Sequence, residues 1–135
     1  MQISALVRNG NGSHEVSVRT GESPRILAIP SKGAGRGSAV NGGEFLMLAL
    51  ATCFCNDVYR EAERLGIPID AVEVEARAEF DGVGVAARNV TYRARVASSE
   101  PEETIARLLR ETDAVTEVQN TLRGGAGVAL VPWGS

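Results

Sequence analysis

Cysteine, histidine and aromatic residues are scarce in this chain of 135 residues. It contains two cysteines, one histidine, one tryptophan, two tyrosines and three phenylalanines. With so few aromatic side chains, we expect a core built from alanine, valine, leucine and isoleucine, for which a hydrophobic fraction of 44% is sufficient. Two cysteines within one apolar stretch are also not the disulfide framework of a small secreted domain.

The chain also lacks a strong charge of one sign and a long apolar run. Its net charge is −3, from 14 basic and 17 acidic residues that are mixed along the sequence, which argues against nucleic acid as the main partner. The longest apolar run, residues 45–55, is too short to span a bilayer, and residues 1–8 alternate instead of resembling a signal segment. We therefore expect one cytoplasmic domain over residues 1–135, with no membrane partner.

Short strands are predicted at the beginning of the chain and one long helix after them. Residues 3–7, 14–19 and 25–29 have strand patterns, and the Asn-Gly-Asn-Gly run at residues 9–12 predicts a hairpin turn. A glycine-rich loop covers residues 30–43. A helix is then predicted for residues 43–65, with Asn41 as its N-cap and Glu44 in its first turn.

The second half of the chain predicts a hairpin and two further helices. Residues 71–80 and 89–97 alternate as two strands, and Pro101 is expected at the first position of the next helix. A helical piece follows at residues 115–122 and a last strand at residues 128–131. This order predicts an α+β fold with antiparallel sheets. Because the first half of the long helix is apolar nearly all round, we expect a homodimer that buries it.

Both cysteines lie in that helix, two residues apart. Successive helical residues are about 100° apart, so Cys53 and Cys55 point about 200° from each other and cannot share a face. A disulfide between them would distort the helix. Cys53 is then either a nucleophile or a small buried apolar residue, and Cys55 is expected to pack. A Cys-x-Cys helix with one histidine does not converge on a metal ion, and no metal or other cofactor is expected. Asn56 and Asp57 are expected to mark where the helix reaches solvent.

Two stretches of sequence resemble the OsmC/Ohr family of osmotically induced and organic-hydroperoxide-resistance proteins. The first is Asn-Gly-Gly-Glu-Phe-Leu at residues 41–46 with Ala-Leu-Ala-Thr-Cys-Phe at residues 49–54. The second is Val-Gln-Asn-Thr-Leu at residues 118–122. The resemblance implies an intertwined homodimer in which antiparallel sheets are wrapped around central helices, with active sites at the subunit interface. It also implies a peroxidatic cysteine that becomes a sulfenic acid and a second cysteine that resolves it as a disulfide.

The family's catalytic residues carry over only in part. Cys53 matches the peroxidatic position, whereas the resolving position falls on Thr116, so the second cysteine is absent. The family's activating arginine could be Arg36 in the glycine loop, or less readily Arg25. Glu44 lies one residue after the position of the family's acidic residue.

Two further residues are secondary candidates. His14, where the first hairpin of the family has an arginine, is read as a surface strand residue that could instead lie near Cys53 of a partner subunit and replace that arginine. Cys55 could resolve the sulfenic acid only if the helix opened locally.

The function that the resemblance implies is thiol-dependent reduction of organic or hydrogen peroxides. Without a resolving cysteine, the sulfenic acid would need Cys55, a small thiol or another external reductant. The alternative is a non-catalytic binding protein with an apolar ligand cavity at the dimer interface, in which Cys53 only lines the cavity.

Overall fold

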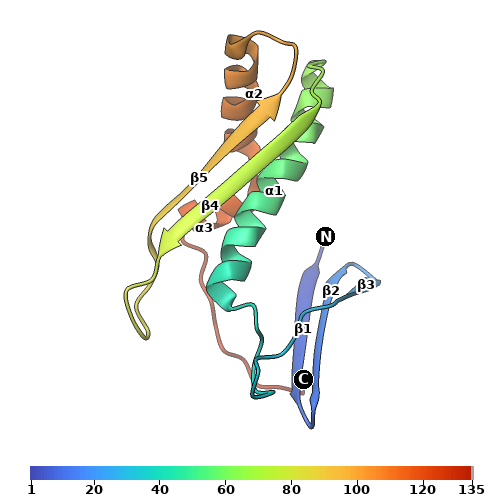
Figure 1. The fold of residues 1–135 in the computed structure, drawn as a ribbon, viewed down its shortest axis with the longest axis vertical. Helices are drawn as coiled ribbons and strands as arrows, with labels where there is room; N and C mark the ends of the chain where they lie inside the picture. The colour runs from blue at the N-terminus through green and yellow to red at the C-terminus, as the bar shows by residue number, and fades with distance from the viewer. Residues whose placement is uncertain (135) are drawn as a thin grey trace. The chain divides into compact units, whose positions relative to one another are not determined.

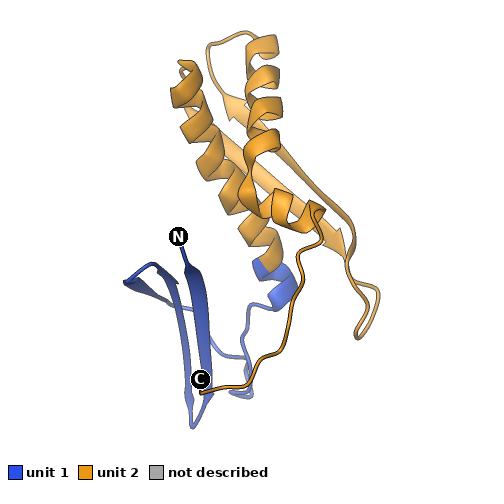
Figure 2. Ribbon diagram, turned by 180° about the vertical axis from the view of Figure 1, so that it is seen from behind, with its two compact units in different colours: residues 1–45 blue, residues 46–135 orange. Residues whose placement is uncertain are grey.

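The computed structural model describes residues 1–134, and the predicted α+β class with antiparallel sheets is confirmed. The chain forms two compact units, residues 1–45 and residues 46–135 (Figure 2). Each unit is described by itself below. The single-domain organisation predicted from the length stays a prediction.

The first unit is a three-stranded antiparallel sheet. Its strands are β1 (Ile3–Gly10), β2 (Ser13–Thr20) and β3 (Ser23–Leu27), in the order β1-β2-β3. Asn11 and Gly12 join β1 to β2 with φ values of 53° and 79°, as a tight hairpin turn of this handedness requires, so the predicted turn is confirmed. The third strand begins two residues earlier than predicted.

The long helix, α1, runs from Gly42 to Leu65. Its start is fixed by reciprocal hydrogen bonds: the Asn41 side chain accepts from the Glu44 backbone N–H at 2.8 Å, and the Glu44 carboxylate accepts from the Asn41 N–H at 3.0 Å. This is a capping box, which satisfies two backbone donors that the helix itself leaves free. Gly66 follows the helix with a φ of 68°, in agreement with the predicted end.

A two-stranded antiparallel sheet packs beside the helices of the second unit. Its strands are β4 (Ala71–Glu79) and β5 (Arg88–Ala97), and the helices lie on one face of it (Figure 1). Alternation turns Val72, Val74, Tyr92, Ala94 and Val96 toward the core. The opposite face carries arginines of β5 paired with glutamates of β4.

The last two helices are α2 (Glu102–Val115) and α3 (Glu117–Arg123). Pro101 is the N-cap of α2 and not its first helical residue, as its ψ of 148° shows. Thr116 is extended, with φ −82° and ψ 118°, so Val115 ends α2 and the third helix begins two residues later than predicted.

The predicted strand at residues 128–131 is wrong. Residues 128–131 have no strand assignment, and the two sheets found among residues 1–134 contain only β1 to β5. Val128 and Leu130 are almost fully exposed in consequence.

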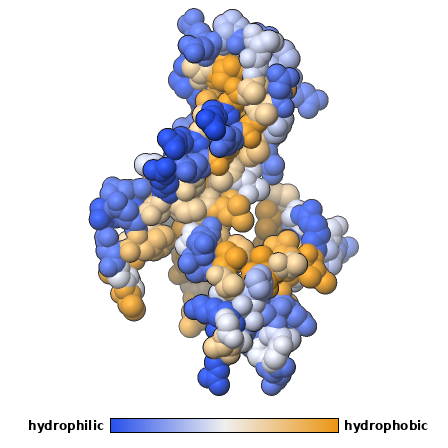
Figure 3. Space-filling view, in the orientation of Figure 1, coloured by the Kyte–Doolittle hydropathy of each residue, from blue (hydrophilic) through white to orange (hydrophobic). Residues whose placement is uncertain are grey.

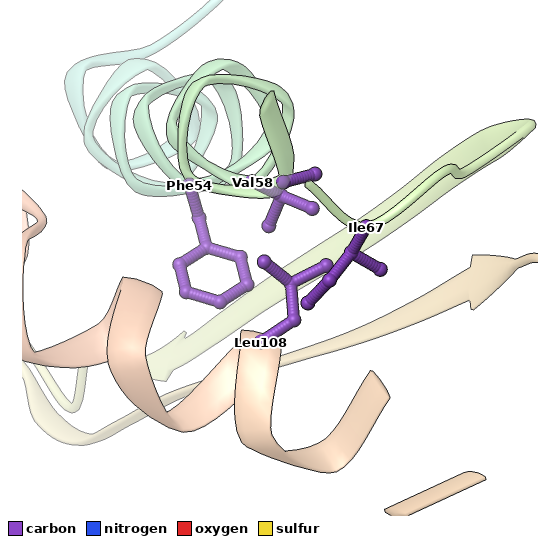
Figure 4. Packing of buried hydrophobic residues seen from close by; sticks show 5 residues of the cluster. Phe54, Val58, Ile67 and Leu108 are labelled. Atoms are coloured by element: carbon purple, nitrogen blue, oxygen red, sulfur yellow. The ribbon is translucent and has the colours of Figure 1, made fainter. Parts of the chain in front are cut away.

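The core of the second unit lies between α1, α2 and the sheet. Phe54, Val58 and Ala62 follow one another at intervals of four residues on α1 and meet Ile67 and Leu108 (Figure 4). The Phe54 ring meets the Tyr92 ring of β5 edge to face, with centroids 4.8 Å apart. This packing fixes the rotation of α1, and hence the direction in which Cys53 points.

Apolar side chains also remain exposed on both units (Figure 3). On α1, Leu50 and Phe54 are buried, whereas Leu48 is 56% exposed. Ile26 on β3 is 87% exposed. Among residues 1–134, no helix has the length and apolar character needed to cross a membrane.

Candidate active site

Cys53 shares a face of α1 with Asp57 and Arg60. The three residues lie at positions i, i+4 and i+7 of the helix, which places their side chains in one row. The Cys53 Sγ lies 3.6 Å from Asp57 Oδ2, and Arg60 Nη1 lies 3.0 Å from Asp57 Oδ1. The Asp57 carboxylate therefore stands between the thiol and the guanidinium, with one oxygen toward each.

The junction between α2 and α3 supplies the other side of the site. Thr116 Oγ1 lies 3.3 Å from the Cys53 Sγ, although the two residues are 63 positions apart in the sequence. Thr116 is fully buried and donates its hydroxyl hydrogen to Gln119 Oε1 at 3.1 Å. Gln119 in turn donates through Nε2 to the Leu50 backbone carbonyl at 2.9 Å, which ties the start of α3 to α1.

Glu117 completes the site from the first residue of α3. Its Oε2 lies 3.8 Å from the Cys53 Sγ, and its Oε1 lies 3.5 Å from Arg60 Nη1. Glu117 and Asp57 thus make the same pair of contacts, each with one oxygen toward the sulfur and one toward Arg60. The sulfur is surrounded by oxygen atoms, and the cation lies beyond them.

The two carboxylates differ in their environment. Asp57 is 6% exposed, and its burial raises its pKa above the ordinary value, with the neighbouring Glu117 acting in the same direction and Thr116 and Arg60 opposing it. Glu117 is exposed, and a hydrogen bond from its own backbone N–H lowers its pKa, helped by Arg60. Asp57 is therefore the carboxylate of this pair that more readily holds a proton.

Ligand atoms of the kind that bind metals are gathered here, because one atom each of Cys53, Asp57 and Glu117 lie within 4.8 Å of one another. Arg60 already pairs with both carboxylates, at 3.0 and 3.5 Å, and would compete with a metal ion for their oxygens. We assign no metal or other cofactor to this site.

An apolar hollow of about 400 Å³ lies nearby in the same unit. Leu50 and Gln119, which take part in the hydrogen-bond network around Thr116, are among its lining residues. Leu46, Val90 and Leu122 give it a mainly apolar wall.

The structure brings together two of the six residues predicted from the sequence, Cys53 and Thr116. Cys55 is a free, half-buried thiol and forms no disulfide with Cys53. The other three predicted residues, His14, Arg36 and Glu44, belong to the first unit.

Two of those three side chains, Glu44 and His14, form hydrogen bonds with residues close to them in the sequence. The Glu44 carboxylate closes the capping box of α1. His14 Nδ1 lies 3.0 Å from the Asn9 side-chain amide, whose oxygen accepts from the Gly37 N–H at 3.0 Å. Arg36 forms no ion pair with any residue of the described range 1–134. A catalytic role for these three residues stays a prediction.

Sequence reasoning missed three members of the site and misread one of them. The expectation that Asp57 marks the point where α1 reaches solvent is wrong, because its side chain is buried between Cys53, Arg60 and Glu117. The spacing of Cys53, Asp57 and Arg60 on one helical face could have indicated the cluster. The signal for Glu117 was its position, because it directly follows Thr116, the residue matched to the resolving cysteine.

Comparison with known proteins agrees with this fold. The family model described as OsmC-like protein matches residues 35–131 of the chain. No match was found among curated protein sequences.

Among solved structures, an organic hydroperoxide resistance protein from Legionella pneumophila is 19% identical, with a TM-score of 0.62 over 92% of this chain and 90% of its own. An OsmC-like protein from Mycoplasma pneumoniae is 18% identical, with a TM-score of 0.62 over 91% of this chain and 86% of its own. OhrB of Bacillus subtilis, an organic hydroperoxide resistance protein, is 16% identical, with a TM-score of 0.55 over 92% of each chain.

These solved structures share the fold of this chain. The chain belongs to the OsmC-like family. The resemblance drawn from residues 41–54 and 118–122 is thereby confirmed.

Proposed function

We propose that this protein reduces hydroperoxides through Cys53. The observation that carries the proposal is the 3.3 Å contact between the Cys53 Sγ and Thr116 Oγ1. The resemblance assigns these positions to the peroxidatic and the resolving cysteine, and they are adjacent in space although far apart in sequence. Two of the similar solved structures are named as organic hydroperoxide resistance proteins, which supports the same class of reaction.

The residue at position 116 determines how the reaction would finish. Cys53 would attack the peroxide O–O bond, become a sulfenic acid and release an alcohol or water. Thr116 carries no thiol, and Cys55 lies two residues along the same helix, on another face. The sulfenic acid would therefore be reduced by an external thiol, through a mixed disulfide that a second thiol cleaves.

The hollow near the site favours organic over inorganic peroxides. Its apolar wall would contact the alkyl part of an organic hydroperoxide. Gln119 both lines the hollow and hydrogen-bonds to Thr116, so it connects the hollow to the site. Burial of apolar substrate surface there contributes roughly 25 cal/mol per Å². We therefore expect an alkyl hydroperoxide to react faster than hydrogen peroxide.

A homodimer is part of the proposal. The exposed apolar side chains of α1 and of the first sheet are of the kind that a second subunit covers, and the resemblance implies an interface formed by these elements. Arg36 with Glu44, or His14 of the partner, would then be the candidates for a further positive or proton-donating group near Cys53.

The test is consumption of cumene hydroperoxide and of hydrogen peroxide with dithiothreitol as the reductant. We expect turnover with both, faster with cumene hydroperoxide, and none in Cys53→Ser. The control is Cys55→Ser, which should retain most of the turnover because that thiol is not part of the Thr116 contact. Equal losses in both variants would contradict the assignment of Cys53.

The same hollow supports a second candidate function, binding of an apolar ligand without chemistry. In that case Cys53 would only lie close to the ligand, and Cys53→Ser would bind it as well as the parent protein does. Absence of turnover in the parent with several thiol reductants, together with saturable binding of an apolar fluorescent probe, would favour the binding protein.

A further inference from the structure

We propose that Asp57 is the proton acceptor and donor of the Cys53 reaction. This inference rests on the proposed peroxide reduction and names a catalytic group for it that lies outside the predicted set of Arg36, Glu44 and His14. It follows from which atoms face the sulfur. Asp57 Oδ2 lies 3.6 Å from the Sγ, close enough to accept its proton.

Among residues 46–134, the side-chain atoms in contact with the sulfur are the oxygens of Asp57, Thr116 and Glu117. Thr116 spends its only hydrogen on Gln119 Oε1, because the Gln119 amide is oriented by its own bond to the Leu50 carbonyl. With its hydrogen directed at Gln119, Thr116 Oγ1 accepts from Cys53. The carboxylate oxygens of Asp57 and Glu117 are acceptors as well. The three side-chain contacts of the sulfur among residues 46–134 are therefore all to acceptors, which suits a thiol whose proton leaves as the sulfur attacks.

Asp57 is better suited to receive that proton than Glu117. Its carboxylate is closer to the sulfur, at 3.6 Å against 3.8 Å, and it is buried where Glu117 is exposed. The directions of their pKa shifts agree with this assignment, since the pKa of Asp57 is raised mainly by burial and that of Glu117 is lowered. Glu117 instead stays ionised and, with Asp57, holds Arg60 in place.

The reaction needs only Cys53, Asp57 and the hydroperoxide, and its atoms and electrons balance. The sulfur lone pair of Cys53 attacks the distal oxygen of the hydroperoxide, and the O–O bond breaks. The thiol proton passes to Asp57 and from there to the departing alkoxide, which leaves as an alcohol. The products are the Cys53 sulfenic acid and the alcohol; sulfur is oxidised by two electrons and the peroxide is reduced by two.

The groups that face Asp57 come from two elements. From α1 they are Cys53 and Arg60, and from the start of α3 they are Thr116 and Glu117. Arg60 Nη1 binds Asp57 Oδ1, which leaves Oδ2 directed at the sulfur. The guanidinium thus orients the carboxylate and keeps one oxygen available for the proton.

The experiment measures two rates at pH 5 to 8: alkylation of Cys53 by iodoacetamide in a Cys55→Ser background, and its oxidation by cumene hydroperoxide. If Asp57 takes the proton, the rates of the protein with Asp57 level off above the pH at which Asp57 ionises. In Asp57→Asn the rates should fall by about 100-fold at neutral pH and rise about tenfold per pH unit, because free thiolate is then the nucleophile.

Glu61→Gln is the matched control. Glu61 is also a carboxylate of α1, is 6% exposed and is bound by Arg60 and Arg64, but the structure shows no contact between it and Cys53. Its pH profile should match that of the parent even if its stability falls. A profile in Asp57→Asn that matches both would overturn the inference.

Two outcomes keep this inference separate from the proposed function. If Asp57→Asn does not fold, a parent profile that rises tenfold per pH unit throughout the range would itself overturn the inference. If alkylation levels off in the parent and rises tenfold per pH unit in Asp57→Asn, yet the parent reacts with no hydroperoxide, the proposed function fails, while proton acceptance by Asp57 stands. If the parent reduces hydroperoxides and Asp57→Asn does so at unchanged rates, the proposed function stands and the role of Asp57 is overturned.

Discussion

The contact between Cys53 and Thr116 leads to a direct test by substitution of Thr116→Cys. The two side chains approach to 3.3 Å, and the two residues come from separate elements, α1 and the α2–α3 junction. A sulfur placed at position 116 would have to move by about 1 Å to reach the S–S bond length of about 2.05 Å. Oxidation of this variant should therefore link residues 53 and 116, as a resolving thiol would.

The size of the effect on stability follows from the sequence separation. A crosslink between residues 63 positions apart restricts the unfolded chain by about 4 kcal/mol in the chain-entropy model. The substitution also removes the hydroxyl that donates to Gln119, which costs about 1 kcal/mol. The oxidised variant should thus be more stable than the parent by about 3 kcal/mol, and the reduced variant less stable by about 1 kcal/mol.

Mass spectrometry and urea unfolding measure both parts of this prediction. Diamide treatment should remove two hydrogens and join the peptides that contain residues 53 and 116. The urea midpoint should rise by roughly 1–2 M at a fixed protein concentration. Thr116→Ser, which retains the hydroxyl, is the control for the substitution itself. A variant that stays reduced, or whose oxidised form joins Cys53 only to Cys55, would refute the placement of Thr116 beside Cys53.

Three further predictions concern the oxidised state, the core and the assembly. Peroxide-treated parent protein should contain a Cys53 sulfenic acid trappable by dimedone and no bond between Cys53 and Cys55; a loss of two hydrogens confined to a peptide holding both would refute the opposite-face geometry. Tyr92→Phe should cost about 1 kcal/mol at pH 7, because Tyr92 donates to Asp113. Burial opposes ionisation of Asp113, but hydrogen bonds from Tyr92 and Arg123 outweigh it and lower the Asp113 pKa. The stability that these bonds contribute is present above the ordinary pKa of 3.8 and is lost as the pH falls through the lowered pKa. The destabilisation caused by Tyr92→Phe, measured by urea unfolding, should therefore shrink at that low pH. Light scattering should give twice the chain mass of 14.2 kDa, and a single-chain mass at micromolar concentration would exclude the dimer.

Local signals allowed most of the secondary structure to be predicted from the sequence. The helix α1 is defined by its capping box at Asn41 and Glu44 and by Gly66 after it, all of which act within a few residues. The Asn11-Gly12 turn is similarly local. The strand predicted at residues 128–131 failed because a strand depends on a neighbour, which periodicity within one segment does not reveal.

The site was harder to predict because its contacts join distant parts of the chain. Periodicity places Cys53 and Cys55 on different faces of α1, but it does not show that Thr116 and Glu117 approach Cys53 from the start of α3. The pairing of positions 53 and 116 came from the family resemblance. Burial of Asp57 was missed for the same reason, since the residues that cover it lie some 60 positions further along the chain.

The most direct test of peroxide chemistry at Cys53 is a single-turnover reaction with one equivalent of cumene hydroperoxide, followed by dimedone and mass spectrometry. The account predicts one equivalent of cumyl alcohol and one dimedone adduct on Cys53, with neither formed by Cys53→Ser. An unmodified Cys53 with the hydroperoxide left intact would contradict it.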